Sequence, residues 1–336
     1  MNTADSARPI ADAEALRAAL AARGHLPADA AAAPPSATRD RPWFVALLLG
    51  VAAWFAGAFG LGCVGLLLSP SGGAWIPIGL VLLAAAWVLL SRVDESNVFG
   101  SQLGLVLSIA GQFALIGGVA ETLFHGDHVV SRVALVAAVL QLALVVAMPD
   151  RLHRVLSTLF ACAAWACVLR FALWDAEPSG RSATTSSFGL ALLAWLLAWA
   201  PPALLLARLL RDEPRWMAAG RQALLRPACT GLVVALAWAT LLSDPLDALR
   251  WSDDHAAADA LWPLLSLLAA ALALLAAFAL RSTGLMGMCI VAGLLHVVQF
   301  YQALAIPLMA KSLTMLALGA VALAAARALA RGRTTP

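Results

Sequence analysis

The sequence predicts an all-α membrane protein, a polytopic transmembrane helix bundle of about ten spans with both termini in the cytoplasm. Three observations support this fold class. Of the 336 residues, 62% are hydrophobic and only 12% are charged, whereas about a quarter of the residues in a soluble domain are charged. The apolar residues form long runs rich in Leu and Ala, which favour helices, and about 20 such residues cross a bilayer. The basic residues also alternate in number between successive loops.

Residues 1–41 are predicted to be a cytosolic segment. Residues 11–23 carry Leu16 and Leu20 at helical spacing, and Gly24 suits the end of a short helix. An Ala- and Pro-rich stretch over residues 27–38 then predicts a linker. The ten-helix membrane domain is predicted over residues 42–330, and residues 331–336 form a short cytosolic tail.

The membrane domain divides at charged or turn-forming interruptions. Residues 43–91 hold no charged side chain and are long enough for two spans, separated by the Ser-Pro-Ser-Gly-Gly turn signal at 69–73. The other eight spans are expected near 101–123, 130–148, 155–174, 187–209, 227–243, 260–280, 283–302 and 308–329. The last pair rests on length, because residues 282–326 hold one charge, Lys311, and Pro307 marks the restart of the helix.

The distribution of basic residues supports this span count. Seventeen of the 22 Arg and Lys residues lie in the N-terminus and the loops on its side, and five lie on the opposite side. Loops rich in basic residues face the cytoplasm, so both termini are predicted to be cytoplasmic. The Ala-, Leu- and Arg-rich composition is typical of a GC-rich bacterium, and we expect a multi-pass protein of the bacterial cytoplasmic (inner) membrane, in contact with the lipid bilayer. The dispersed net charge of +3 does not indicate nucleic-acid binding.

Lys311 is the most informative candidate site residue. It is predicted at the start of the last span, near the outer interface, where a cation opposes the positive end of the helix dipole. Glu121 is expected at comparable depth, at the outer end of the third span. Two interpretations remain open, an ion pair between Lys311 and Glu121, or a lysine that snorkels to water.

A second polar group lies beside Glu121 and contains His125, Asp127 and His128. Oxygen and imidazole ligands suit zinc, and Glu121 and His125 would share a helix face at i,i+4 spacing. The spacing matches no specific metal motif. We therefore prefer a plain polar cap at the end of the span, with Glu121, His125 and His128 as weak metal candidates, and we predict no cofactor.

Polar residues recur at every third position in the ninth span, at His296, Gln299 and Gln302, beside the single tyrosine, Tyr301. We expect this face to turn inward, because polar side chains in lipid need partners. The face would either form interhelical hydrogen bonds, which we prefer, or bind a ligand.

Gln112 and Gln141 allow the same two interpretations as the polar ninth span. Pro201-Pro202 lies within the sixth span. Proline removes amide donors, so we expect that helix to kink or open, as helices do at many transporter sites.

Both ends of the membrane domain carry a familiar pattern. An aromatic-rich span precedes a Leu-rich stretch, a Lys-Ser pair and a final helix with a glycine, at Phe300, Tyr301, Leu308, Lys311, Ser312 and Gly319. The helix ending at Gly24 and the start of the first span, Pro42-Trp43 followed by Gly50 and Trp54, fit the same pattern. The sequence thereby resembles a bacterial multi-pass membrane protein family named domain of unknown function 4401. The resemblance implies a second membrane protein encoded nearby as a partner, and it carries over no catalytic residue.

Three functions are compatible with these features. We prefer a non-enzymatic component of a membrane complex. The alternative is a transporter, or a protein that binds a small molecule or lipid through the polar face of the ninth span and the Pro-kinked sixth span. An enzyme, the least favoured, would need Glu121, His125 and His128 to converge with Lys311.

Overall fold

The computed structural model describes residues 43–68, 72–93, 97–125, 128–174, 188–239, 261–303 and 307–331, together with Gly24. Every regular element in these ranges is helical, which confirms the all-α fold class. The chain divides into two compact units, Met1–Val51 and Ala52–Pro336. The N-terminal helix and linker expected from the sequence lie outside the described residues. Gly24 is described and has a φ of 71°, the left-handed conformation common after a helix.

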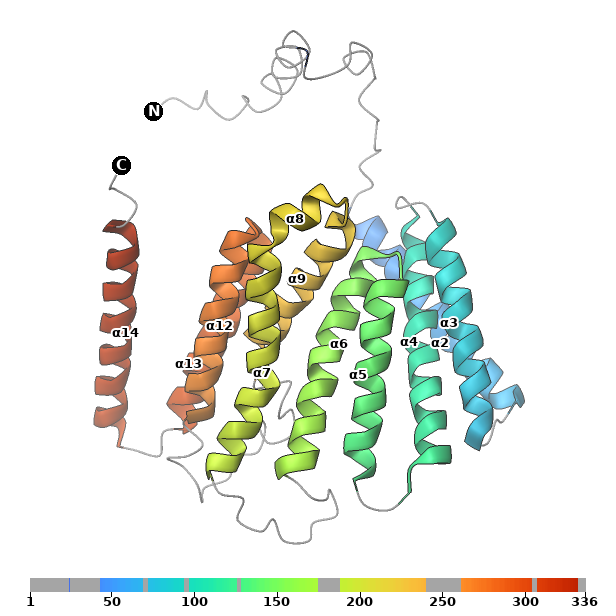
Figure 1. Ribbon diagram of the computed structural model, residues 1–336, viewed down its shortest axis with the longest axis horizontal. Helices are drawn as coiled ribbons and strands as arrows, with labels where there is room; N and C mark the ends of the chain where they lie inside the picture. Colours follow the sequence, from blue (N-terminus) through green and yellow to red (C-terminus); the bar gives the residue numbers. More distant parts are fainter. Residues whose placement is uncertain are drawn as a thin grey trace. The chain divides into compact units, whose positions relative to one another are not determined.

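Figure 1 shows the helices in chain order. Their bounds are α2 (Trp43–Leu68), η2 (Gly72–Ala74), α3 (Trp75–Arg92), α4 (Val98–Leu123), α5 (Val129–Ala147), α6 (Arg151–Leu169), η3 (Arg170–Trp174), α7 (Phe188–Arg211), α8 (Glu213–Ala218), α9 (Gln222–Ala237), α12 (Leu261–Ala279), α13 (Thr283–Ala303) and α14 (Leu308–Arg331).

Within the described residues, seven helices are long and apolar enough to cross a membrane. Shorter apolar segments lie at Leu47–Cys63 in α2, at Gln222–Ala237, which is α9, and at Leu308–Ala317 in α14. These segments match the ten predicted spans in position, and the last helix begins directly after Pro307 as predicted. The number of crossings and the side of the termini stay predictions. The largest shift is in α9, which begins at Gln222 rather than near residue 227 because the helix includes Arg226 and Pro227.

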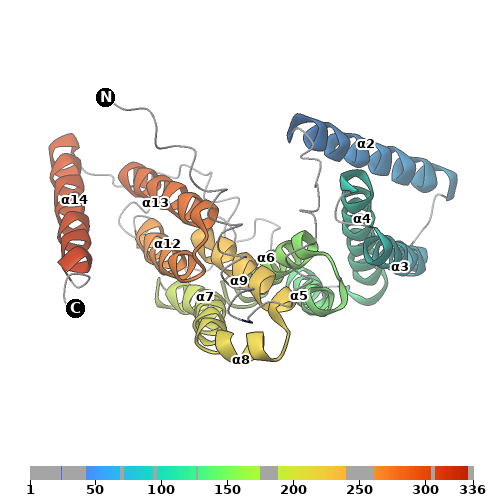
Figure 2. The ribbon, with the colours of Figure 1, turned by 90° about the horizontal axis from the view of Figure 1, so that it is seen from above.

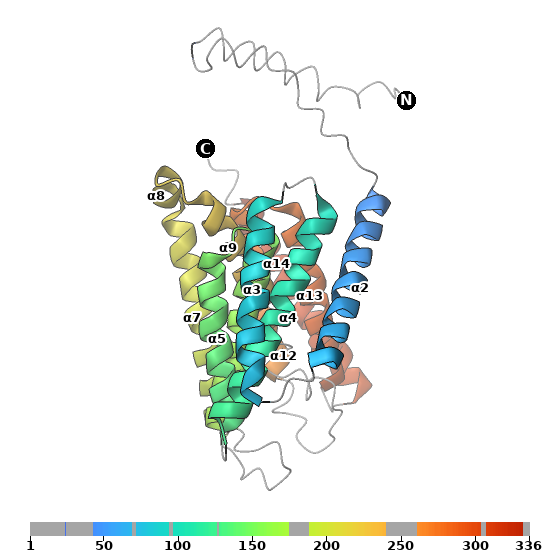
Figure 3. The ribbon, with the colours of Figure 1, turned by 90° about the vertical axis from the view of Figure 1, so that its right-hand side faces the viewer.

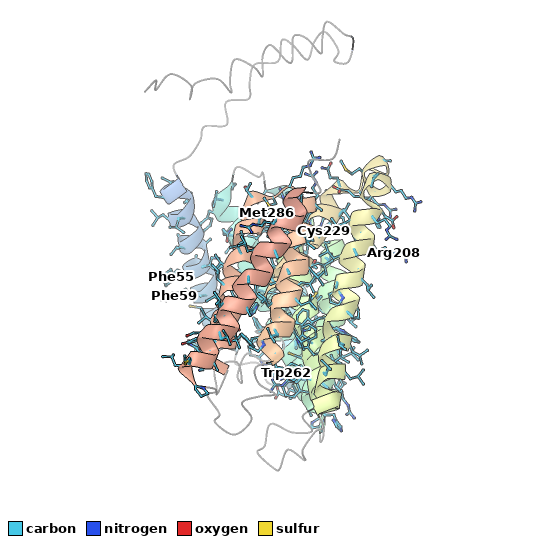
Figure 4. All side chains as sticks on the ribbon, turned by 90° about the vertical axis from the view of Figure 1, so that its left-hand side faces the viewer. Phe55, Phe59, Arg208, Cys229, Trp262 and Met286 are labelled. Carbon is cyan, nitrogen blue, oxygen red and sulfur yellow. The ribbon has the colours of Figure 1, made fainter. Side chains whose placement is uncertain are left out.

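Many large apolar side chains are exposed on the outer faces of these helices. Phe55 and Phe59 on α2 point away from the neighbouring helices (Figure 4) and are 66% and 76% exposed. In water such surfaces are costly, whereas lipid solvates them. Together with the long apolar helices, this exposure is compatible with an integral membrane protein.

The main apolar core surrounds α9. This helix is short and most of it after the first turn is buried, and α6, α7, α12 and α13 pack around it (Figure 2). Its buried residues include Leu232, Val233 and Leu236, each at most 2% exposed. A smaller cluster joins α3 to α5 through Leu83, Leu90, Leu144 and Met148.

Glycines allow α3 and α4 to pack closely. A Cβ atom added to Gly79 of α3 would lie 2.7 Å from the Gly111 carbonyl of α4, and one added to Gly118 would lie 2.9 Å from the Ile76 amide nitrogen. Gly104, Gly111 and Gly118 recur every seventh residue, so they form one stripe along α4. Small residues bring helix backbones together in membranes, and this stripe does so here.

Two helices contain internal prolines, and α6 supplies a donor to each. In α7, Pro201 has no amide hydrogen for the Leu197 carbonyl, and the Trp165 indole Nε1 donates to that oxygen at 3.2 Å. In α9, Pro227 leaves the Ala223 carbonyl free, and Arg154 Nη1 donates to it at 2.8 Å. The double proline predicts that the sixth span kinks or opens. The span does not open, because α7 continues as one helix from Phe188 to Arg211, and the kink stays a prediction.

Candidate functional site

Five of the nine buried polar side chains in the described part of the chain form one group that joins α4, α5 and α6. Its five side chains are Ser108 and Gln112 on α4, Gln141 on α5, and His153 and Ser157 on α6. Each of these residues is at most 5% exposed. Buried polar groups in an apolar interior must bond to one another, and these five do so.

The five side chains form a continuous hydrogen-bonded chain. Gln141 Nε2 donates to Gln112 Oε1 at 2.6 Å, and Gln112 Nε2 donates to Ser108 Oγ at 3.1 Å. Ser108 Oγ lies 2.6 Å from His153 Nε2, and Ser157 Oγ lies 3.1 Å from His153 Nδ1. Because Ser108 Oγ accepts from Gln112, its hydroxyl hydrogen is available for His153 Nε2. The Nδ1 hydrogen then points to Ser157, and all four bonds run in one direction.

The sequence between α5 and α6 places His153 in this chain. Pro149 follows the end of α5, and Asp150 takes the extended conformation that begins α6, with φ −71° and ψ 138°. The Asp150 carboxylate accepts the backbone amide of His153 at 2.7 Å, which is the usual N-cap bond. The cap fixes the first turn of α6, so the imidazole faces Ser108 one turn inside the helix end.

One end of the hydrogen-bonded chain has an unused acceptor. Gln141 Oε1 is buried and has no hydrogen-bond partner among the described residues. The amide cannot simply be turned over, because Oε1 would then face Gln112 Oε1. An unsatisfied buried carbonyl oxygen costs about 1–3 kcal/mol. A donor at this position, from water or a ligand, would remove that cost.

The chain of hydrogen bonds can reverse its direction, but its Ser108 hydroxyl is not accessible to a substrate. A hydroxyl close to an imidazole is the contact between a nucleophile and its base. Ser108 is, however, completely buried, and the third group is the Ser157 hydroxyl, where a hydrolase triad has a carboxylate. If both amides turned over and the imidazole proton moved to Nε2, the same contacts would run in the opposite order.

Sequence reasoning singled out Gln112 and Gln141 but missed Ser108, His153 and Ser157. The available signal was spacing: Ser108 with Gln112, and His153 with Ser157, are i,i+4 pairs in apolar spans. Two such pairs predict polar helix faces that need partners, but nothing in one sequence says that the two faces meet.

The structure does not bring the expected metal candidates together. Helix α4 ends at Leu123 and Phe124 is extended, so His125 lies beyond the helix and does not share a face with Glu121, as the i,i+4 spacing suggested. His128 begins α5 with a φ of 62°, and Asp127 lies outside the described residues. No group of three metal-binding side chains occurs in the described ranges.

Lys311 lies in the first turn of α14, and its Nζ atom stands 5.1 Å from the centre of the Tyr301 ring. This is a cation–π contact. Among the described ion pairs none joins Lys311 to Glu121, so both interpretations of this lysine stay hypotheses.

The polar residues of the ninth span do not turn inward as one face. His296 is buried, Gln299 is half-buried and Gln302 is exposed. His296 Nε2 lies 2.9 Å from the Ala237 carbonyl of α9, and its Nδ1 lies 3.1 Å from Gln299 Oε1. His296 therefore links α13 to the buried α9, which is the interhelical role that we preferred.

A groove lined by residues of α2, α3 and α4 is the second candidate site. Figure 3 shows the three helices that contribute this lining. The groove holds about 540 Å³, and its wall is mainly apolar with many small residues. Gly62 and Gly65 of α2 and Ala114 and Gly117 of α4 line it, and Glu121 is the one charged side chain among the described residues of the lining.

Comparison with known proteins gives one result. A family model described as "Domain of unknown function (DUF4401)" matches residues 42–262, which span α2 to the first residues of α12 and contain both candidate sites. The C-terminal pattern at residues 296–319 lies outside this match. No curated protein and no solved structure matches the chain. Because this family model matches well over half of the length of the chain, the chain belongs to the DUF4401 family.

Proposed function

We propose that this protein is a non-enzymatic component of a membrane complex in the bacterial inner membrane, and that the groove between α2, α3 and α4 receives a helix of a second membrane protein. The observation that supports this proposal is the groove itself. Its small residues would let a partner backbone approach closely, as small residues do in membrane helix pairs. Its size and apolar wall suit side chains of a helix rather than a polar solute.

The negative charge of Glu121 indicates which charge the partner helix should carry. Glu121 is exposed at the end of α4 and forms no ion pair among the described residues. A carboxylate at the edge of lipid gains from an opposite charge. The partner helix should therefore carry Lys or Arg at the membrane end where Glu121 lies, and small residues along the following two turns.

Filling the groove tests this proposal. Gly62 lines it and Gly60 does not, yet a side chain at either glycine meets nothing within 4 Å. Gly62→Leu should abolish co-purification of a membrane partner from native membranes while protein abundance is unchanged, and Gly60→Leu is the matched control. Glu121→Gln should weaken the same association. Equal recovery of the partner with Gly62→Leu and Gly60→Leu would refute the proposal.

Lys311 gives an independent test of the complex. Lys311→Met should leave abundance unchanged if the lysine serves a partner, and should lower the recovered partner. If abundance falls and the partner-to-protein ratio is unchanged, the lysine is structural and the Tyr301 contact accounts for it.

A second candidate function, binding or transport of a small polar solute, is favoured by the unused acceptor Gln141 Oε1. The expected elements, the ninth span and the double-proline span, are less suitable. His296 is already bonded to Ala237, and the Leu197 carbonyl in α7 is satisfied by Trp165. A solute that donates a hydrogen bond should raise the thermal stability of the native chain and not of Gln141→Leu. Equal stabilisation of both would exclude this role for Gln141.

A further inference from the structure

Helix α12 ends in an unusual way at Arg281. The Ser282 amide donates to the Ala277 carbonyl at 3.2 Å, and Arg281 has a φ of 52°. This six-to-one bond closes a helix through a left-handed residue, which is usually glycine. The end of α8 follows that rule, because Gly220 has a φ of 69° and the Arg221 amide donates to the Trp216 carbonyl at 3.0 Å. The Cβ atom of arginine disfavours the left-handed conformation. Strained backbone conformations of this kind cluster at functional sites, so we ask what the Arg281 side chain binds.

Arg281 lines a pocket at the end of the bundle where α12 ends and α8 lies. The pocket holds about 530 Å³ between α8, the start of α9 and the end of α12. Its charged lining residues are Arg226, Arg281 and Glu213, and its apolar wall comes from Pro214, Met217, Ala279 and Leu280. Arg226 Nη2 lies 4.0 Å from Glu213 Oε1. No ion pair of Arg281 occurs in the described part of the chain.

The surroundings of the pocket are strongly positive. Residues 208–226 hold five arginines against two carboxylates, and Arg281 adds a sixth. Arg208 and Arg215 share Asp212, with nearest distances of 4.0 and 3.2 Å. Figure 4 shows Arg208 toward this end of the bundle and Trp262 toward the other. These surroundings carry an excess of four positive charges, and the pocket itself is lined by two arginines and one carboxylate. Its apolar wall is formed partly by Met217, which is 43% exposed.

We propose that this pocket binds the phosphate of an anionic lipid headgroup, with Arg281 and Arg226 as its two guanidinium ligands. Guanidinium groups bind phosphate oxygens in pairs, and basic pockets between helices at a membrane surface bind such headgroups. The apolar wall beside the two arginines favours a lipid over free phosphate, because it can contact the glycerol and first acyl carbons. Glycine would be less strained at position 281. The arginine costs backbone strain but places a positive charge beside the pocket.

The test is native mass spectrometry of the purified chain with phosphatidylglycerol and with phosphatidylcholine of the same acyl chains. Arg281→Gly should weaken phosphatidylglycerol binding about five- to tenfold, the effect of one guanidinium near a phosphate, and leave phosphatidylcholine binding unchanged. The same variant should be at least as thermally stable as the native chain, because glycine relieves the left-handed strain. A variant that simply misfolds would instead lose stability.

Arg211→Gln is the matched control, since Arg211 lies at the same end but does not line the pocket. It should keep nearly native binding of phosphatidylglycerol. Equal weakening by Arg211→Gln and Arg281→Gly would show that the charge acts diffusely and would overturn the site. Inorganic phosphate should not displace the lipid at comparable concentrations. Displacement by phosphate alone would overturn the assignment to a lipid.

Discussion

Replacing Trp165 with phenylalanine should destabilise the bundle because it removes the donor to a carbonyl that proline has freed. The Leu197 carbonyl lies near the middle of α7, a helix long and apolar enough to cross a membrane, and Pro201 cannot donate to it. Lipid around such a helix offers no other donor. Trp165→Phe keeps an aromatic ring in place and removes the indole N–H. Pro201→Ala restores an amide hydrogen that can donate to the same oxygen within the helix.

The magnitude follows from the environment of the bond. Hydrogen bonds between membrane helices contribute about 0.6 kcal/mol on average and about 1.7 kcal/mol at most. The Leu197 carbonyl has lost its helical donor, so Trp165→Phe should cost about 1–2 kcal/mol, toward the upper end of that range. In the Pro201→Ala background, the cost of Trp165→Phe should fall to the small difference in packing between the tryptophan and phenylalanine rings. The coupling free energy between the two positions should therefore be about 1 kcal/mol or more.

The assay is unfolding of the purified protein in mixed micelles, followed by circular dichroism. Trp195→Phe is the matched control, because the buried Trp195 Nε1 has no hydrogen-bond partner among the described residues. The same substitution there removes an unsatisfied donor and should be neutral or stabilising. If Trp165→Phe costs the same in the native chain as in the Pro201→Ala background, or if Trp195→Phe costs as much, the proposed role of the indole is wrong.

Three other substitutions test the packing and the hydrogen bonds. Arg154→Met should cost about 1 kcal/mol, less in a Pro227→Ala background, and thermal unfolding of the four combinations measures the difference. Gly118→Ala should destabilise the α3–α4 contact by about 1–3 kcal/mol, whereas Gly117→Ala, where a Cβ meets nothing within 4 Å, should be neutral or slightly stabilising; similar melting temperatures would refute the close approach. Ser108→Ala should cost about 1–3 kcal/mol by removing the shared partner of a buried amide and imidazole, and unchanged stability would show that the chain of bonds is dispensable.

The helices could be predicted from the sequence because lipid imposes one simple requirement, about 20 apolar residues between polar interruptions. Predictions are least accurate where a charged or proline residue lies inside a helix. The sequence pattern puts Arg226 and Pro227 at the edge of a span, but α9 includes both. The arginine is half-exposed at the polar end of the helix, and Arg154 satisfies the carbonyl freed by the proline.

The candidate site was less predictable, because its parts come from three helices. Gln112 and Gln141 are 29 residues apart, and Ser108 and His153 are 45 apart. Periodicity places each residue on a helix face but does not say which faces meet. The prominent charges, Glu121 and Lys311, attract attention because they are rare in apolar surroundings, whereas serine and histidine in an apolar run are easily passed over.

The family match provides a last test of the proline contacts without any experiment on this chain. Residues 42–262 contain both prolines and both donors, and each donor is needed only while its proline is present. Among family members, loss of Pro201 should therefore accompany loss of a donor at Trp165, and the same should hold for Pro227 and Arg154. The two pairs should vary independently, because they join α6 to different helices, α7 and α9. If Trp165 is retained equally in members with and without Pro201, the indole serves another purpose, and the unfolding cycle for this pair should then show no coupling.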